Sequence, residues 1–162
     1  MVTTGGGTPD DDVLVSVILE KFDELVALVA SCDDATANAV PAAGRPEAMN
    51  SPIQLLVHTC GMMRRWSCSV NRGLPVPRDR DAEFTARMPA AEALALASRT
   101  RADFRDDVAS TDPDAAPAAV PAGREHLWTG SCRGVLLHVF EEICQHLGHA
   151  EITRDMLDRP GR

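Results

Sequence analysis

Apolar side chains recur along this chain at intervals of three and four residues, the spacing at which side chains share one face of an α-helix. Four segments follow this pattern: about Asp11 to Ser31, Ser51 to Val70, about Pro89 to Ala109 and about Gly130 to Asp158. No segment shows a convincing alternation of apolar and polar positions, which is typical of strands. The pattern therefore predicts an all-α protein.

The second of these segments has the clearest start. Ser51 is an N-cap residue, Pro52 suits the first helical position, and Gln54 completes a capping box. The third segment has the weakest apolar stripe, because Arg101 interrupts it. We expect all four segments to be helices.

Long connections rich in proline separate the predicted helices. The linker DDATANAVPAAGRPEAMN holds two prolines, and TDPDAAPAAVPAGREH holds three. Such segments are too long for tight turns and are typical of crossover connections. Long helices joined in this way predict a four-helix bundle.

Length and charge limit the class of protein. The chain has 162 residues, which suits one domain, expected over residues 11–159 after a disordered leader at residues 1–10. The net charge of −8 argues against nucleic-acid binding, which requires a basic face. No apolar run is long enough to span a membrane and no secretory signal is present, so we expect a cytoplasmic protein.

The five cysteines follow no CxxC spacing: Cys32, Cys60, Cys68, Cys132 and Cys144. Most lie in apolar helical segments, which favours buried, reduced thiols over a disulfide framework. Cys60 and Cys144 are conceivable nucleophiles, but neither has an activating base at a fixed spacing.

Two polar residues border the apolar face of the last predicted helix. Glu142 and His146 lie four residues apart, so their side chains project the same way. A carboxylate beside the core is costly unless it is paired or bound to a metal. The plain alternative is that Glu142 is an edge residue, exposed or hydrogen-bonded to a histidine. Glu141 falls on the solvent side.

A third candidate ligand, His58, lies in the apolar context LLVHTC of the second predicted helix. Two imidazoles and a carboxylate make a divalent-metal site with positions open for a substrate. Taken alone, His58 is more simply explained as a satisfied core histidine than as a ligand. His138 and His149 lie near the same stripe and compete as ligands, while His126 fits a pocket mouth or the surface.

Three sequence contexts together resemble one group of proteins. EEICQHLGHAEITRD, NSPIQLLVHTCGMMRRW and LPVPRDRDAEF are similar to segments of the DinB-like superfamily of metal-binding four-helix bundles, especially its actinobacterial mycothiol-dependent branch. The resemblance covers roughly Asn50 to Arg159. It implies a metal bound by His58, Glu142 and His146, with zinc expected and nickel or another divalent ion as the alternative, and it implies a homodimer. The carboxylate at Glu142 resembles the mycothiol-dependent maleylpyruvate isomerase, but that enzyme carries a further C-terminal domain, so we expect a thiol S-transferase.

The resemblance leads to a hypothesis about the reaction. We expect a metal-dependent transferase in which the ion stabilises the thiolate of mycothiol, which attacks a small electrophile. Arg78 and Arg80 are candidate thiol-binding residues, unless RDRDAEF is a solvated loop whose charges pair with each other. Met62, Trp66 and Trp128 are candidates for an apolar substrate pocket, although Met62 and Trp66, at helical spacing, are more simply explained as core residues.

Other functions fit the same bundle. It could be a non-catalytic protein that sequesters a metal or a small molecule, in which case His138 or His149 would close the site as a fourth ligand. A bundle without metal, acting through dimerisation, is the third possibility.

Overall fold

The computed structural model describes residues 12–41 and 49–158. The expected leader at residues 1–10 lies outside these residues. In the described part the chain is all-helical and forms no strand, which confirms the predicted fold class.

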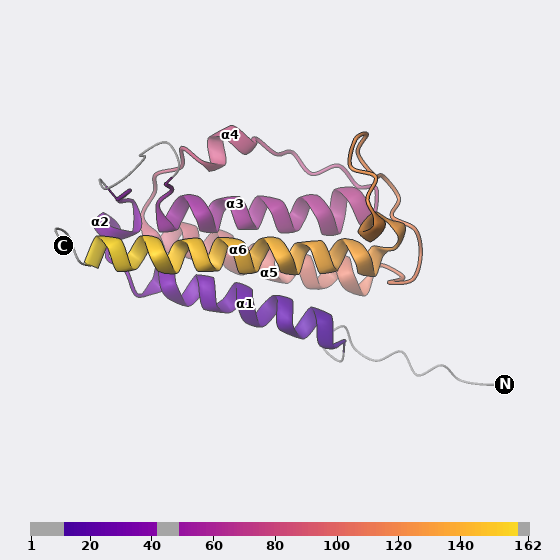
Figure 1. The fold of residues 1–162 in the computed structure, drawn as a ribbon, viewed down its shortest axis with the longest axis horizontal. Helices are drawn as coiled ribbons and strands as arrows, with labels where there is room; N and C mark the ends of the chain where they lie inside the picture. The colour runs from indigo at the N-terminus through magenta and orange to yellow at the C-terminus, as the bar shows by residue number, and fades with distance from the viewer. Residues whose placement is uncertain (1–11, 42–48, 159–162) are drawn as a thin grey trace.

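Four long helices run side by side along the molecule (Figure 1). They are α1 (Val13–Ala30), α3 (Pro52–Arg64), α5 (Ala90–Ala109) and α6 (Cys132–Asp158). Each of α1 and α3 packs against both α5 and α6. The bundle thereby brings α3 and α6, which carry the candidate ligands, into direct contact.

Shorter helical segments occupy the connections. They are α2 (Asp34–Ala37), α4 (Arg80–Glu83) and the 3₁₀-helix η4 (Leu127–Gly130). The sequence pattern did not predict them, because a single helical turn is too short to show a period. Among these, α4 matters most for the site, because it lies against α3 (Figure 1).

The second predicted helix begins as expected and then changes its winding. Ser51 Oγ accepts from the Gln54 amide at 3.2 Å, and Gln54 Oε1 accepts from the Ser51 amide at 2.9 Å, which confirms the capping box. After Arg64 the chain continues as a π-helix, η3 (Arg65–Asn71). Such wider turns are uncommon and occur often near functional sites.

Hydrogen bonds tie both ends of α3–η3 to α6, and at one end the crossover takes part. The amide of Ala118 in the crossover donates to the Asn71 carbonyl at 3.2 Å. The Cys132 amide at the start of α6 donates to the Ala115 carbonyl at 2.8 Å. At the opposite end, Thr153 Oγ1 donates to the Asn50 carbonyl at 3.4 Å.

Apolar side chains of all four long helices form one core. Its largest fully buried members are Phe22, Phe104, Ile18, Leu25, Ile53, Leu55, Leu56, Met62, Met63 and Ile143. In α5, Ala97 and Phe104 are buried as predicted, while Leu94 and Val108 are partly buried. Arg101, which interrupts the stripe of α5, forms an ion pair with Asp23 of α1, with Nε and Oδ1 2.9 Å apart.

A buried carboxylate joins α5 to the end of α3. Asp107 accepts hydrogen bonds from Ser67 Oγ at 2.7 Å and Arg72 Nη1 at 2.7 Å, and it also pairs with Arg64. Its side chain is almost completely shielded from solvent. Two cations and a hydroxyl thus compensate for the desolvation of this charge.

None of the helices among the described residues has both the length and the apolar character needed to cross a bilayer.

Candidate metal centre

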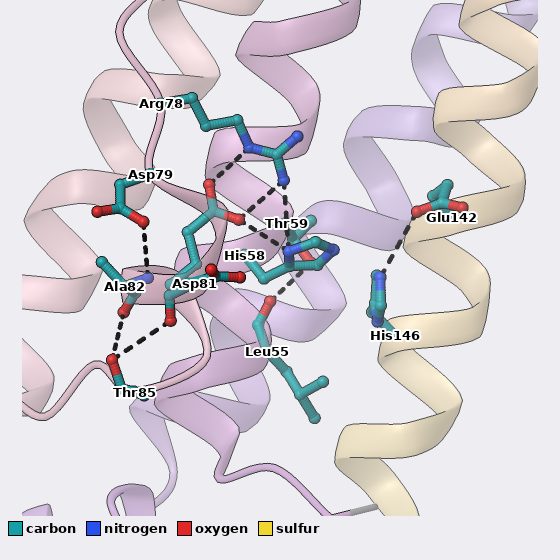
Figure 2. A network of polar contacts seen from close by, with 11 residues as sticks. Leu55, His58, Thr59, Arg78, Asp79, Asp81, Ala82, Thr85, Glu142 and His146 are labelled. Atoms are coloured by element: carbon teal, nitrogen blue, oxygen red, sulfur yellow. Dashed lines mark hydrogen bonds and ion pairs between the residues drawn. The ribbon is translucent and has the colours of Figure 1, made fainter. Parts of the chain in front are cut away.

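The interface between α3 and α6 brings His58, Glu142 and His146 together. Each offers one ligand atom, and these atoms all lie within 4.8 Å of one another. His146 Nε2 is 3.7 Å from Glu142 Oε2, and the His58 and His146 rings meet edge to face, with centroids 4.6 Å apart. Figure 2 shows Glu142 and His146 one turn apart on α6, across from His58 on α3.

The group of three is buried on one side and open on the other. His58 is 3% exposed, whereas the side chains of Glu142 and His146 are 29% and 18% exposed. Glu141, the neighbour of Glu142, projects into solvent as the periodicity predicts. A small molecule can therefore approach the group from the α6 side.

The chemistry of this donor set fits a divalent cation. The contact with His146 lowers the pKa of Glu142 below its ordinary value and outweighs burial, which would raise this pKa. The carboxylate is therefore ionised near neutral pH. Two imidazole nitrogens and one carboxylate oxygen are the ligands of many catalytic zinc sites, in which the fourth position takes water or substrate.

Neither competing histidine joins the group. In the described part of the chain, the set of possible ligands around His58 contains only Glu142 and His146. His138 Nε2 comes within 3.9 Å of Glu142 Oε1, but its ring stacks on Trp128. His149 also lies outside the set. Burial lowers the pKa of His149 and thereby favours the neutral form of its imidazole.

On the side away from α6, His58 meets a buried carboxylate that the sequence analysis did not single out. His58 Nδ1 lies 2.9 Å from Glu83 Oε2, and Glu83 is 7% exposed. Arg78 donates to both oxygens of Glu83, from Nε at 2.7 Å and from Nη2 at 2.8 Å. Burial alone would raise the pKa of Glu83, but the hydrogen bonds from Arg78 and His58 lower it.

The charged loop matches the expectation of mutually paired charges only in part. Two of its charges, Arg78 and Glu83, form an ion pair in which Glu83 is buried and the Arg78 side chain is only 18% exposed, so this pair is not solvated. The Arg78 guanidinium is engaged by Glu83. The Arg80 guanidinium lies over the Phe84 ring, 5.0 Å from its centroid, and Phe84 stacks on His58 with centroids 4.3 Å apart.

Two of the three residues expected to line an apolar pocket lie together. Trp66 and Trp128 meet edge to face with centroids 5.3 Å apart. His126 and His138 stack on Trp128, at 5.3 Å and 4.0 Å between centroids. Met62 is fully buried in the same core cluster as Trp66, which favours its interpretation as a core residue.

The aromatic group borders the ligand set through His138, which contacts both Trp128 and Glu142. Gly134 allows this arrangement, because a Cβ at that position would overlap the Trp128 carbonyl oxygen. The sequence signal for the group was only the presence of two tryptophans and two histidines. Their stacking depends on the path of the crossover.

The protein's own thiols are poor nucleophiles. All five cysteines are free. Burial raises the pKa of Cys60 to about 12, and burial also raises the pKa of Cys144. Both therefore remain thiols near neutral pH, in agreement with the absence of an activating base at a fixed spacing.

Comparison with known proteins gives one result. The family model described as mycothiol-S-transferase matches residues 14–159. No curated protein and no solved structure matches the chain.

Proposed function

The chain belongs to the mycothiol-S-transferase family, a DinB-like branch of helical bundles, and on this basis we propose that it transfers a low-molecular-weight thiol, mycothiol, to a small electrophile at a divalent-metal site. The observation that supports the proposal most directly is the half-open set of His58, Glu142 and His146 at the α3–α6 interface. Zinc is the proposed ion, because tetrahedral sites of nitrogen and oxygen ligands suit it.

The three ligands would hold the ion, which when bound stabilises the thiolate form of a thiol near neutral pH. In the transfer, the thiol loses its proton and its sulfur forms a bond to an electrophilic carbon of the substrate. The electron pair of the bond that breaks leaves with the departing group, or moves onto an acceptor atom of the substrate that then takes a proton. The partial exposure of Glu142 and His146 gives both reactants access.

The state of the cysteines supports an external thiol as the nucleophile. Burial keeps the Cys60 thiol protonated, with a pKa of about 12, and Cys144 is affected in the same direction. A reaction that needs a thiolate at neutral pH is therefore better served by a thiol delivered to the open side of the site.

Candidate contacts for the two reactants lie beside His58 and, through His138, beside Glu142. We propose that Arg80, which lies over Phe84, donates to the hydroxyls of the thiol's sugar part. We propose the same role for Arg78. Its Nε and Nη2 already donate to Glu83, so the remaining guanidinium nitrogen would contact the thiol. We propose Trp66 and Trp128 as the apolar wall for the electrophile, with the buried Met62 as part of the core that supports it.

The family and the free cysteines bear on the compartment and the oligomeric state of the protein. Unpaired cysteines suit a reducing compartment, so the proposal places the protein in the cytoplasm, as a homodimer with one domain over residues 11–159. The alternative of a sequestering protein with a closed site has less support. The fourth ligand it requires is absent from the set around His58 in the described residues.

A transfer assay tests the proposal. Metal-loaded protein is incubated with mycothiol and a chromogenic alkyl or aryl halide, beside His58→Ala and Glu141→Gln proteins. We expect conjugate formation in the wild type and in Glu141→Gln, and a rate close to the uncatalysed one in His58→Ala. Equal rates in wild type and His58→Ala would show that the ligand set has no part in the reaction.

A further inference from the structure

We propose that Glu83 is a positioning residue, which holds His58 in the Nδ1–H tautomer with Nε2 free for the metal, and that Gly61 provides the space for its carboxylate. The inference rests on the proposed function, because it concerns the same metal site. It goes further by assigning roles to two residues that lie outside the ligand set.

The contacts around His58 Nδ1 decide the tautomer. Glu83 Oε2 lies 2.9 Å from this nitrogen, within normal hydrogen-bond distance, whereas Arg78 Nη2 lies 3.4 Å away. An ionised carboxylate only accepts and a guanidinium only donates, so the shorter contact requires a proton on Nδ1. A neutral imidazole has one N–H, and its lone pair is then on Nε2.

That lone pair is on the side where the metal would bind. In Figure 2 the nitrogen of His58 that is not bonded to Glu83 points across the interface, towards Glu142 and His146. A histidine ligand needs a lone pair on the coordinating nitrogen, and a carboxylate on its other N–H fixes the ring and increases its basicity. Without this acceptor, the proton would be distributed over both ring nitrogens.

Glu83 is itself held in place. Arg78 contacts both of its oxygens, at 2.7 Å and 2.8 Å, and α4 carries it against α3. Phe84, the next residue, stacks on the His58 ring at 4.3 Å between centroids. The last residue of α4 therefore supplies the acceptor for Nδ1, and the C-cap residue that follows it supplies a surface that fixes the plane of the ring.

Gly61 explains how the carboxylate can come this close to α3. A Cβ at this position would overlap Glu83 Oε1 and would come within 3.2 Å of Arg78 Nε. Glycine inside a helix is about 1 kcal/mol less favourable than alanine, so its presence in the middle of α3 calls for a reason. The approach of Glu83 supplies that reason.

The test measures the tautomer in metal-free protein. Histidine labelled with ¹⁵N reports from its ring nitrogen shifts which nitrogen carries the proton. We expect His58 to be the Nδ1–H form in the wild type and in Glu83→Gln, which keeps an acceptor oxygen. In Glu83→Leu, which has none, and in Gly61→Ala, which displaces the carboxylate, we expect Nε2–H to be populated.

Zinc affinity, measured by competition with a chromophoric chelator, gives the second readout. We expect Glu83→Leu and Gly61→Ala to bind zinc about 10–100-fold more weakly than the wild type. Gly148→Ala is the matched control, because a Cβ there meets nothing within 4 Å, and we expect its affinity to equal that of the wild type. If Glu83→Leu does not fold, Gly61→Ala tests the same contact.

The outcomes separate this inference from the proposed function. His58 as Nδ1–H in every variant, with unchanged zinc affinity, would overturn the positioning role while leaving the metal site intact. Zinc bound equally by wild type and His58→Ala would instead contradict the proposed ligand set. The tautomer measurement remains decisive for Glu83 in that case, because it needs no metal.

Discussion

His58 and His146 meet edge to face across the interface of α3 and α6, with ring centroids 4.6 Å apart and planes at 81°. Such an arrangement lets a nitrogen of each ring face a common point beside Glu142. The site thereby joins two helices that are distant in the sequence, so an ion bound there should also stabilise the bundle.

Zinc should therefore raise the melting temperature. At a free concentration about 100 times its Kd, one bound ion adds about 2.7 kcal/mol, or about 5–10 °C for a chain of this size. Calorimetry with zinc and after chelation measures the difference. We expect Glu142→Gln to lose most of it and Glu141→Gln, with an exposed side chain, to keep it. Equal shifts in the two variants would count against Glu142 as a ligand.

Gly134→Ala should disturb the aromatic group. The added Cβ would overlap the Trp128 carbonyl oxygen, so η4 must move and the contacts of Trp128 with Trp66 and His138 weaken. Near-ultraviolet circular dichroism and tryptophan fluorescence measure this change. We expect a rise in KM for the electrophile with zinc affinity unchanged, and Gly148→Ala should show neither effect. Unaltered spectra would mean that η4 accommodates the methyl group.

Asp107→Ala should lower the free energy of unfolding by about 2–4 kcal/mol, because it removes the shared acceptor of Arg64, Ser67 and Arg72 in a buried position. Urea unfolding measures the loss. Asp106→Ala, at the exposed neighbouring position, should stay within about 0.5 kcal/mol of the wild type. A similar loss in both variants would point to a general effect on α5.

Asp12 should make stability depend on pH. Burial alone would raise the pKa of Asp12, but the hydrogen bonds from Arg133 and from the Leu14 amide lower this pKa below 3.8 in the folded protein. A lowered folded pKa gives stability that is present above the unfolded value and is lost as the pH falls through the folded value.

The variant Asp12→Asn isolates this contribution, because asparagine still caps α1 but carries no charge. At about pH 6 we expect the wild type to be more stable by about 0.5 kcal/mol, a small value because the Arg133 pair is partly exposed. The difference should shrink towards about pH 3 in urea unfolding experiments. A difference independent of pH would assign the effect to capping geometry alone.

The sequence was sufficient to predict the long helices and the three candidate ligands. Amphipathic spacing and the Ser51 cap predicted the ends of the long helices to within a few residues. The separation of four residues between Glu142 and His146 placed both side chains on one face of their helix. These features are local, so they appear in the residues themselves. His58 was a candidate from its apolar context, and a resemblance favoured it over His138 and His149. The structure brings one ligand atom each of His58, Glu142 and His146 within 4.8 Å of one another.

Glu83 could not be found in the same way. It lies 25 residues from His58, in a loop whose charges have no period, and only the packing of α4 on α3 brings the two together. The π-helix of η3 was missed for a related reason, since Arg65–Asn71 keeps an apolar pattern close to that of an α-helix. Gly61 was a detectable signal, because a glycine inside a strongly predicted helix indicates a close approach.

The hydrogen bonds at the two ends of the α3–α6 pair reduce the entropy that the chain loses when an ion binds between the helices. The crossover through Ala118 and Ala115 fixes one end, and Thr153 with Asn50 fixes the other, so the site lies between two attachment points. The spacing of the helices is then set when the chain folds. An ion that binds there meets a preorganised site, and little of its binding free energy is spent on ordering the backbone.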